Sequence, residues 1–344
     1  MRIIIDAMSG DNAPLEIIKG VSLAAKEYLD HNMVLVGDEN VISDIAVKNE
    51  IDLTGVEFIN SKSVITMEDN PLFVIRDKKD SSMSVGLKAL ANGEGDAFVS
   101  AGNTGALLTG STIIVKRIPG INRAAIASVL PLTNPVLLMD SGANLTVTSD
   151  NISQFAFMGA KYMEKIYGID RPRIGLLNNG TEYNKGNALQ VESYQLLTDS
   201  GLNFVGNVEG KEIPFDVCDC VVTDGFTGNI FLKTIEGMGK FMLSTLKDVL
   251  KTNIVTQMST LTMTQKIKDM KHRFDASEHG GAPLLGISKP VIKAHGSSDS
   301  NSIKNAIRQA INFVNPGINE DITMFAADDD EKKLLADAEK IYND

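Results

Sequence analysis

The sequence predicts an α/β fold with a mostly parallel sheet, and two observations lead to this prediction. Short β-branched runs alternate with runs of helical period from end to end, which requires crossover helices between parallel strands. Six of the apolar runs also end at a small or polar residue that opens a turn rich in Gly, Ser or Asn. No internal repeat or linker interrupts the pattern, so we expect one main unit.

The expected elements follow this alternation along the chain. The strands in order are residues 2–6, 34–36, 56–59, 97–100, 125–130, 136–140, 173–177, 218–223 and 290–295. The main helices between them are residues 14–29, 104–115, 151–167, 187–199 and 300–314.

The composition is that of a globular protein with a sizeable core, because 43% of the 344 residues are hydrophobic and 22% are charged. The 33 basic and 44 acidic residues give a net charge of −11, which argues against a general nucleic-acid binder. Cys218 and Cys220 stand two apart in an apolar run and are interpreted as free thiols of a reducing cytosol. No stretch approaches the ~20 apolar residues of a membrane span, and no signal peptide precedes the first strand, so we expect a soluble, cytoplasmic protein.

The six turns are the most informative feature. They begin at Asp6, Ser100, Asp140, Asn178, Asp224 and His295, and read DAMSGDNAP, SAGNTG, DSGAN, NNGTEYNKGN, DGFTGN and HGSSDS. Because the carboxyl ends of parallel strands meet at one edge of a sheet, we expect all six turns to converge on one site. Several of them open helices, whose first backbone N–H groups bind anions, so the turns favour a phosphate-sized ligand. Each turn taken singly is better explained by the needs of a tight turn, but six turns of the same polar, Gly-rich character together favour a binding site.

Standard catalytic motifs are missing. Residues 180–187 place a Lys after four spacers but lack the Ser or Thr of a P-loop, and no G-x-G-x-x-G follows the first strand. The serine-hydrolase elbow, the H-E-x-x-H helix and the EF-hand loop are also absent. Asp6, Asp11, Asp140 and Asp224 are candidate magnesium ligands, but capping and turn roles explain them as well, so we expect no metal and no cofactor.

Residues 230–274 differ from the rest of the chain in charge. They hold eight basic and three acidic residues, a net charge of +5, with apolar residues stepping by three or four. Such a segment is typical of a helix that lies on an anionic membrane or docks an acidic partner, although a core-facing helix pair with a solvated basic face fits equally well. Residues 316–344 carry nine acidic and three basic residues and are interpreted as a solvated appendage to a catalytic unit of residues 1–315.

Several stretches resemble the bacterial phosphate acyltransferase family of phospholipid synthesis. They are IDAMSGDNAP at the start, VSAGNTGALLTGS from Val99, GLLNNGTEYNKGN from Gly175, FVGNVEG from Phe204, DGFTGNIFLKTIEG from Asp224, and GGAPLLG with PVIKAHGSSD from Gly280 onward. The resemblance runs from Met1 to about Val314 with the motifs in family order. It departs from the family at Ser9 and His279, which bear on the finer shape of the site, and in the loop of residues 179–184, which bears on the acyl-chain or carrier specificity.

The resemblance implies a three-layer α/β/α fold like that of isocitrate and isopropylmalate dehydrogenases. It also implies that the protein transfers a long-chain fatty acyl group from acyl-(acyl carrier protein) to inorganic phosphate, giving acyl phosphate for a downstream membrane glycerol-3-phosphate acyltransferase. A homodimer, peripherally associated with the inner face of the cell membrane, is implied as well. Neither a metal nor a covalent intermediate is required, because phosphate is already an anionic nucleophile and a thiol is a tolerable leaving group.

The resemblance assigns Lys185 and Asn229 to phosphate positioning and oxyanion stabilisation, although turn or capping roles explain both residues equally well. The candidate phosphate cradle is Ser100, Gly102, Asn103 and Thr104. Residues of second rank are Asp6, Asp224, His295 and Ser297. The membrane or carrier contact is expected at Ile254, Val255, Met258, Leu261, Met263, Lys266 and Lys268.

The sequence is also compatible with three rival functions. A coenzyme A-dependent phosphate acetyl- or butyryltransferase shares the chemistry and the fold. An NAD- and metal-dependent dehydrogenase of the same fold needs an arginine cluster, and only Arg117, Arg123, Arg171 and Arg173 stand near the six turns. A non-enzymatic scaffold for lipid enzymes at the membrane surface is the third.

Overall fold

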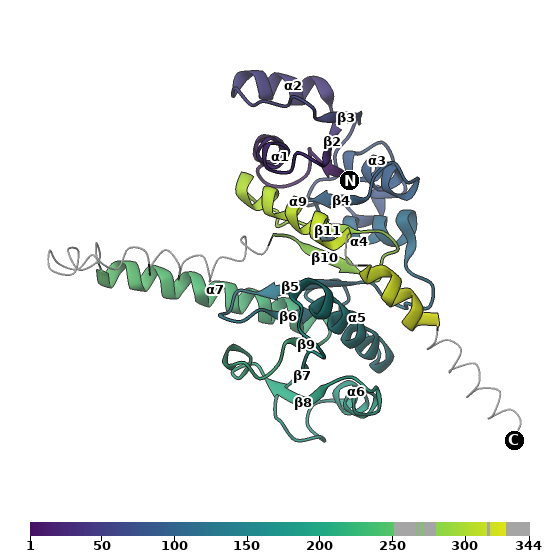
Figure 1. The fold of residues 1–344 in the computed structure, drawn as a ribbon, viewed down its shortest axis with the longest axis vertical. Coiled ribbons are helices and arrows are strands. Elements are labelled where there is room, and N and C mark those ends of the chain that lie inside the picture. The colour runs from purple at the N-terminus through teal and green to yellow at the C-terminus, as the bar shows by residue number, and fades with distance from the viewer. Residues whose placement is uncertain (251–265, 267–269, 271–279, 315–316, 328–344) are drawn as a thin grey trace, which may run out of the picture.

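A computed structural model describes residues 1–250, 266, 270, 280–314 and 317–327 (Figure 1). Within these residues, eleven strands form one sheet in the order β3-β2-β1-β4-β11-β10-β5-β6-β9-β7-β8. The strands are β1 (Arg2–Asp6), β2 (Asn32–Gly37), β3 (Glu57–Asn60), β4 (Ala97–Ser100), β5 (Ala125–Leu130), β6 (Val136–Met139), β7 (Ile174–Asn178), β8 (Phe204–Glu209), β9 (Cys220–Val222), β10 (Ala282–Leu285) and β11 (Val291–Lys293).

The sheet consists of two parallel halves that run in opposite directions. Strands β3, β2, β1, β4 and β11 are mutually parallel, and so are β6, β9, β7 and β8. Between the halves, β10 is antiparallel to both β11 and β5, and β5 is antiparallel to β6. These three reversals place the carboxyl ends of the two halves at opposite edges of the sheet.

Helices cover both faces of the sheet. They are α1 (Leu15–Glu27), α2 (Glu39–Lys48), α3 (Ser82–Ala91), α4 (Thr104–Gly110), α5 (Ser149–Tyr167), α6 (Ala188–Asp199), α7 (Gly225–Leu250) and α9 (Ser300–Val314). Alternation along β1 shows the layers, because Ile3 and Ile5 pack in a core with α1, α5 and α9, whereas Ile4 packs in a second core with α3 and α4. The first turns of α7 pack against a third apolar cluster, on the half of the sheet formed by β6, β9, β7 and β8. The predicted three-layer α/β/α architecture is therefore confirmed.

Each of the nine predicted strands is present, three of them with the predicted ends and the others with ends within two residues of the prediction. The prediction missed β8 and β10. The predicted helix 104–115 is divided, since α4 passes at Ser111 into a π-helical stretch, Ser111–Lys116.

The predicted boundary after residue 315 is wrong. Residues 318–327 are helical, and Ile318, Ile322 and Ala326 are buried in the main core. Phe325 stacks on Phe157 of α5 with ring centroids 3.5 Å apart. The packed unit therefore extends to residue 327, because an apolar face inside this acidic stretch finds a partner in α5. The rest of the predicted appendage lies outside the described residues.

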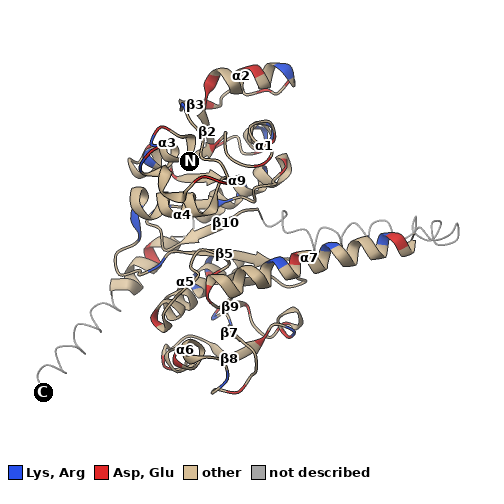
Figure 2. Ribbon diagram, turned by 180° about the vertical axis from the view of Figure 1, so that it is seen from behind, with Lys and Arg blue, Asp and Glu red and all other residues tan. Residues whose placement is uncertain are grey.

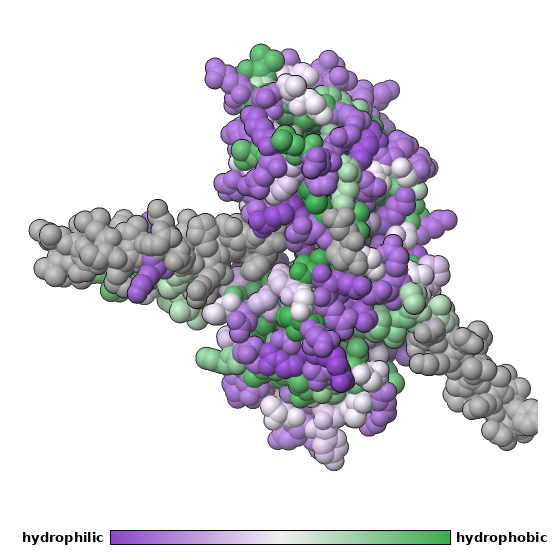
Figure 3. Space-filling view, in the orientation of Figure 1, coloured by the Kyte–Doolittle hydropathy of each residue, from purple (hydrophilic) through white to green (hydrophobic). Residues whose placement is uncertain are grey.

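Helix α7 projects sideways from the body of the molecule (Figure 1). It exposes large apolar side chains at Phe226, Ile230, Met238, Phe241, Met242 and Val249. Basic and acidic residues lie between them along the helix (Figure 2). Figure 3 shows hydrophobic patches and a hydrophilic one along the visible lower side of this arm. Among the described helices, none has the length and apolar character needed to cross a membrane.

Candidate functional site

The six turns form two groups of three rather than one site. The turns after β1, β4 and β11 begin at Asp6, Ser100 and His295, and we call their side of the sheet the first edge. The turns after β6, β7 and β9 begin at Asp140, Asn178 and Asp224, and we call the opposite side the second edge. The prediction that all six converge is wrong because it assumed a single strand direction, whereas the sheet reverses at β10, β5 and β6.

At the second edge, the buried Asp140 carboxylate organises the turn after β6. Its Oδ1 accepts hydrogen bonds from the backbone N–H groups of Ile126, Gly142 and Ala143 at 3.0–3.1 Å. Its Oδ2 accepts bonds from both the backbone and the side-chain nitrogen of Asn144 at 2.7 and 2.8 Å. Burial raises the pKa of Asp140, and these hydrogen bonds oppose that rise. The carboxylate is thus fully used in holding the turn.

The start of α7 lies directly against this turn. A Cβ at Gly228 would come within 1.9 Å of the Asp140 carbonyl oxygen, and one at Gly225 within 2.7 Å of the Asn144 carbonyl oxygen. Only glycine allows this approach. It brings Asn229 beside Gly142, where the Asn229 side-chain oxygen lies 3.6 Å from the position that a Cβ on Gly142 would occupy.

Lys185 lies on the exposed loop between β7 and α6. The Asn178 side-chain nitrogen donates to the Lys185 carbonyl oxygen at 3.1 Å, and the Asn207 side chain donates to the Glu182 carbonyl oxygen at 2.7 Å. The Lys185 side chain is 49% exposed, and its ammonium lies 3.9 Å from the Glu182 carboxylate. An exposed pair of this kind contributes little to stability, so this contact would not prevent the ammonium from pairing with another anion. Because β7 and β9 are neighbours, this loop and the start of α7 share the second edge.

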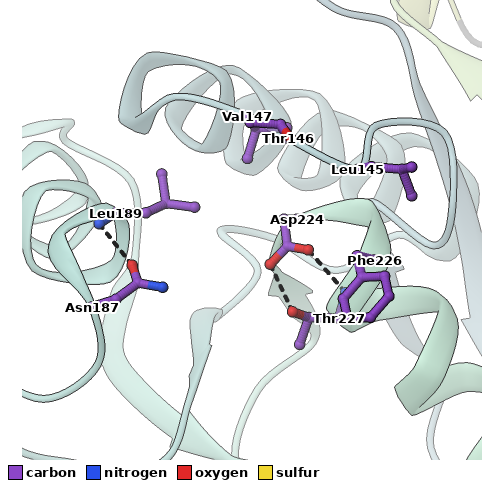
Figure 4. A pocket seen from close by; sticks show the side chains of 8 residues that line it. All are labelled: Leu145, Thr146, Val147, Asn187, Leu189, Asp224, Phe226 and Thr227. Carbon is purple, nitrogen blue, oxygen red and sulfur yellow. Dashed lines mark hydrogen bonds between the residues drawn. The ribbon is translucent and has the colours of Figure 1, made fainter.

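An open pocket of about 480 Å³ lies between this loop, the start of α7 and the segment after the Asp140 turn (Figure 4). Asp224 caps α7 by accepting bonds from the Thr227 nitrogen and hydroxyl at 2.9 and 2.7 Å. Asn187 caps α6 through its side-chain oxygen, which accepts from the Leu189 nitrogen at 2.8 Å. The residues that line the pocket are Leu145, Thr146, Val147, Asn187, Leu189, Asp224, Phe226 and Thr227.

At the first edge, most polar side chains of the predicted phosphate cradle are hydrogen-bonded within the protein. The Ser100 hydroxyl donates to Asp6 at 2.8 Å and accepts from the Gly102 nitrogen at 3.1 Å. The Asn103 side chain donates to the Met67 carbonyl oxygen at 2.9 Å and accepts from the Ala106 nitrogen at 3.0 Å. Thr104 begins α4 at this edge. These bonds leave the backbone of the turn and Thr104 as the groups that a ligand would meet here.

His295 and Ser297 also lie at the first edge, exposed and bonded to each other. The His295 Nδ1 and the Ser297 hydroxyl are 2.9 Å apart. The Asn12 side chain donates to the Ser297 carbonyl oxygen at 3.1 Å, which ties this turn to the one after β1.

Sequence reasoning missed Lys293, a partly buried lysine at the end of β11. It pairs in register with Ser100, and its ammonium donates to the Ala294 carbonyl oxygen. Burial lowers the pKa of Lys293 to about 8, against the opposing effect of Asp11 and Asp6. Burial also raises the pKa of Asp6. The available signal was a lysine inside the apolar run VIKA, where a charge is rare.

The remaining predicted residues are placed only in part. Lys266 is described and exposed, whereas Ile254, Val255, Met258, Leu261, Met263 and Lys268 lie outside the described residues, as does His279. Cys218 and Cys220 are buried free thiols, as predicted. Within the described part of the chain, no three His, Cys, Asp or Glu side chains gather closely enough to hold a metal ion.

Residues 1–321 match the model of the family described as Fatty acid synthesis protein. The chain belongs to this family. It is 47% identical over 315 residues to a protein of Caldanaerobacter subterraneus subsp. tengcongensis named Phosphate acyltransferase, covering 91% of this chain and 94% of that one. The protein of the same name from Bacillus pumilus is 46% identical over 316 residues, covering 91% of this chain and 94% of the relative.

Solved structures agree on the fold. A phosphotransacetylase from Streptococcus pyogenes superimposes with a TM-score of 0.57 at 19% identity, covering 90% of this chain and 94% of that chain. The EutD phosphotransacetylase from Staphylococcus aureus does so with a TM-score of 0.55 at 14% identity, covering 93% of this chain and 94% of that chain. The mixed α/β architecture is therefore one that known proteins share.

Proposed function

We propose that this protein transfers a long-chain fatty acyl group from acyl-(acyl carrier protein) to inorganic phosphate, and that the reaction takes place at the second edge. Relatives named Phosphate acyltransferase across more than nine-tenths of the chain support the reaction class. One observation supports this location: the loop that holds Lys185 and the start of α7 line the same partly apolar pocket.

The chemistry needs positioning more than it needs a nucleophilic side chain. A phosphate oxygen attacks the thioester carbonyl carbon, the carbonyl oxygen gains negative charge, and the tetrahedral intermediate collapses by breaking the carbon–sulfur bond. The products are acyl phosphate and the carrier thiol. Lys185 supplies a positive charge for phosphate or the oxyanion, and the Asn229 amide donates a hydrogen bond, both from elements fixed by the sheet edge.

The long helix α7 is the proposed docking element. Its exposed Met238, Phe241 and Met242 lie among lysines, which suits both an acidic carrier protein and an anionic membrane surface. We place carrier docking and peripheral membrane contact on the segment of residues 230–274, in a homodimer at the inner face of the cell membrane. The contact residues from Ile254 onward belong to the same proposal.

The test is the phosphate-dependent release of free thiol from palmitoyl-(acyl carrier protein), with palmitoyl-coenzyme A in parallel. We expect release that requires phosphate, prefers the carrier and falls about 100-fold in Lys185→Ala, the usual effect of removing one transition-state donor. The matched control is Lys211→Ala, on the loop after β8, which removes another exposed lysine that pairs with a glutamate, Glu209.

Three results would reject the proposal. Preference for the coenzyme A thioester would favour the phosphate acetyl- or butyryltransferase class. No phosphate-dependent release from folded protein would favour a dehydrogenase or a scaffold. Equal loss in Lys185→Ala and Lys211→Ala would remove Lys185 from the site.

A further inference from the structure

The pocket at the second edge has an apolar side that the phosphate chemistry does not use. Val147 and Leu189 form part of it and pack against the main core, so they are held firmly in place. Leu145 and Phe226 complete it and remain 71% and 58% exposed. Two large side chains held at the mouth of a pocket in contact with water mark a surface that an apolar ligand would cover.

Most polar side-chain atoms of the same pocket hydrogen-bond to other residues that line it. Asp224 accepts both bonds from Thr227, and the Asn187 oxygen accepts from the Leu189 nitrogen. This orientation leaves the Asn187 amide nitrogen on the pocket side (Figure 4). The pocket thus has Asn187 beside Leu189 at one end and Asp224 and Thr227 beside Phe226 at the other, so each end has both polar and apolar groups.

The two ends of the pocket adjoin the two proposed reacting groups. Asn187 stands two residues after Lys185, so one end adjoins the lysine loop. Phe226 stands in the first turn of α7, three residues before Asn229, so the other end adjoins Asn229. The tail of an acyl thioester that reacts beside these groups would lie against the apolar side of the pocket.

We propose that this pocket binds the acyl chain of the substrate beside the reacting thioester, with Phe226 and Leu189 limiting chain length. The proposal rests on the proposed function and adds to it the place where the chain lies. The volume of about 480 Å³ is within the range of small-molecule pockets. The Asp224 carboxylate on the wall disfavours an anionic occupant such as a nucleotide, whereas a neutral hydrocarbon chain meets no opposing charge.

The experiment compares Phe226→Ala with Phe215→Ala, which removes another exposed phenylalanine, 79% exposed and outside the pocket. We measure kcat/KM for octanoyl through stearoyl donors. The ratio of palmitoyl to octanoyl specificity should fall about 10-fold in Phe226→Ala, the usual effect of losing one large apolar contact. It should stay at the parental value in Phe215→Ala.

A second variant narrows the pocket. Leu189→Phe should shift the acyl-chain length with the highest kcat/KM toward shorter chains. Leu196→Phe, on the exposed side of the same helix, should leave the dependence of kcat/KM on chain length unchanged. Unchanged profiles in both Phe226→Ala and Leu189→Phe, with an active parent, would overturn the proposal.

Binding of the fluorescent fatty acid cis-parinaric acid provides a readout that does not depend on turnover. The parent should bind it, and Phe226→Ala should weaken binding about 10-fold. If the parent transfers no acyl group but binds the probe in this manner, the proposed function fails and the chain site stands. If the parent transfers acyl groups and Phe226→Ala binds the probe as tightly as the parent does, the chain site fails and the function stands.

Discussion

Asp140 shows how a buried carboxylate organises a site without reacting in it. Five hydrogen bonds hold its two oxygens, and the turn they fix is the surface on which α7 rests. Lys185 stands on the loop after β7 and Asn229 near the start of α7, both at the same edge of the sheet, and the resemblance to a family predicted both as site residues. Lys293 was not predicted, because hydrophobic periodicity locates a strand but does not show which of its side chains face a neighbouring carboxylate.

The pH dependence of folding tests the burial of Lys293. The folded protein releases this proton near pH 8, whereas the unfolded chain holds it to 10.5. Between these values the unfolded state binds more protons, so stability rises with pH. The free energy of unfolding of the parent should therefore rise relative to that of Lys293→Met between about pH 8 and pH 10, by at most about 1.4 kcal/mol per pH unit.

Urea denaturation of parent and variant at matched pH values measures this difference. Below about pH 8 the lysine is protonated in both states, so the difference should be flat there. A difference that is constant over the whole range would show that the ammonium is well solvated in the folded protein.

At the scale of elements, the strand positions were predictable and the helix contacts were not. Short apolar runs located nine strands, but β10 is an APLL segment with no β-branched residue, and β8 contains three polar or glycine positions. The close approach of α7 to the Asp140 turn depends on Gly225 and Gly228, whose role is visible only once the two segments lie together. The docked end of α7 is what positions Asn229.

Substitution of Gly228 tests this docking. Gly228→Ala places a methyl group within 1.9 Å of the Asp140 carbonyl oxygen, so the helix must move. We expect a loss of about 3 kcal/mol in the free energy of unfolding, together with a loss of turnover. Gly237→Ala is the control in the same helix, because a Cβ there meets nothing within 4 Å and alanine favours helix by about 1 kcal/mol. Equal stability of the two variants in thermal unfolding would refute the docking.

At the scale of the whole molecule, two parallel halves joined through antiparallel strands create two separate functional edges. Hydrophobic patterns carry no information on strand direction, so the sequence predicted the turns correctly and their convergence wrongly. The second edge combines an exposed lysine, an amide and a partly apolar pocket. The first edge has its serine and asparagine side chains tied into the fold. We therefore propose the second edge as the place of acyl transfer.

The most direct measurement is kcat/KM for phosphate in Asn229→Ala, at the second edge, and in Thr104→Val, at the first. Both variants are first shown by thermal unfolding to be folded. The account predicts a loss of about 100-fold in Asn229→Ala and a value within about 2-fold of the parent in Thr104→Val. Collapse in Thr104→Val with parental activity in Asn229→Ala would contradict it and move the chemistry to the first edge.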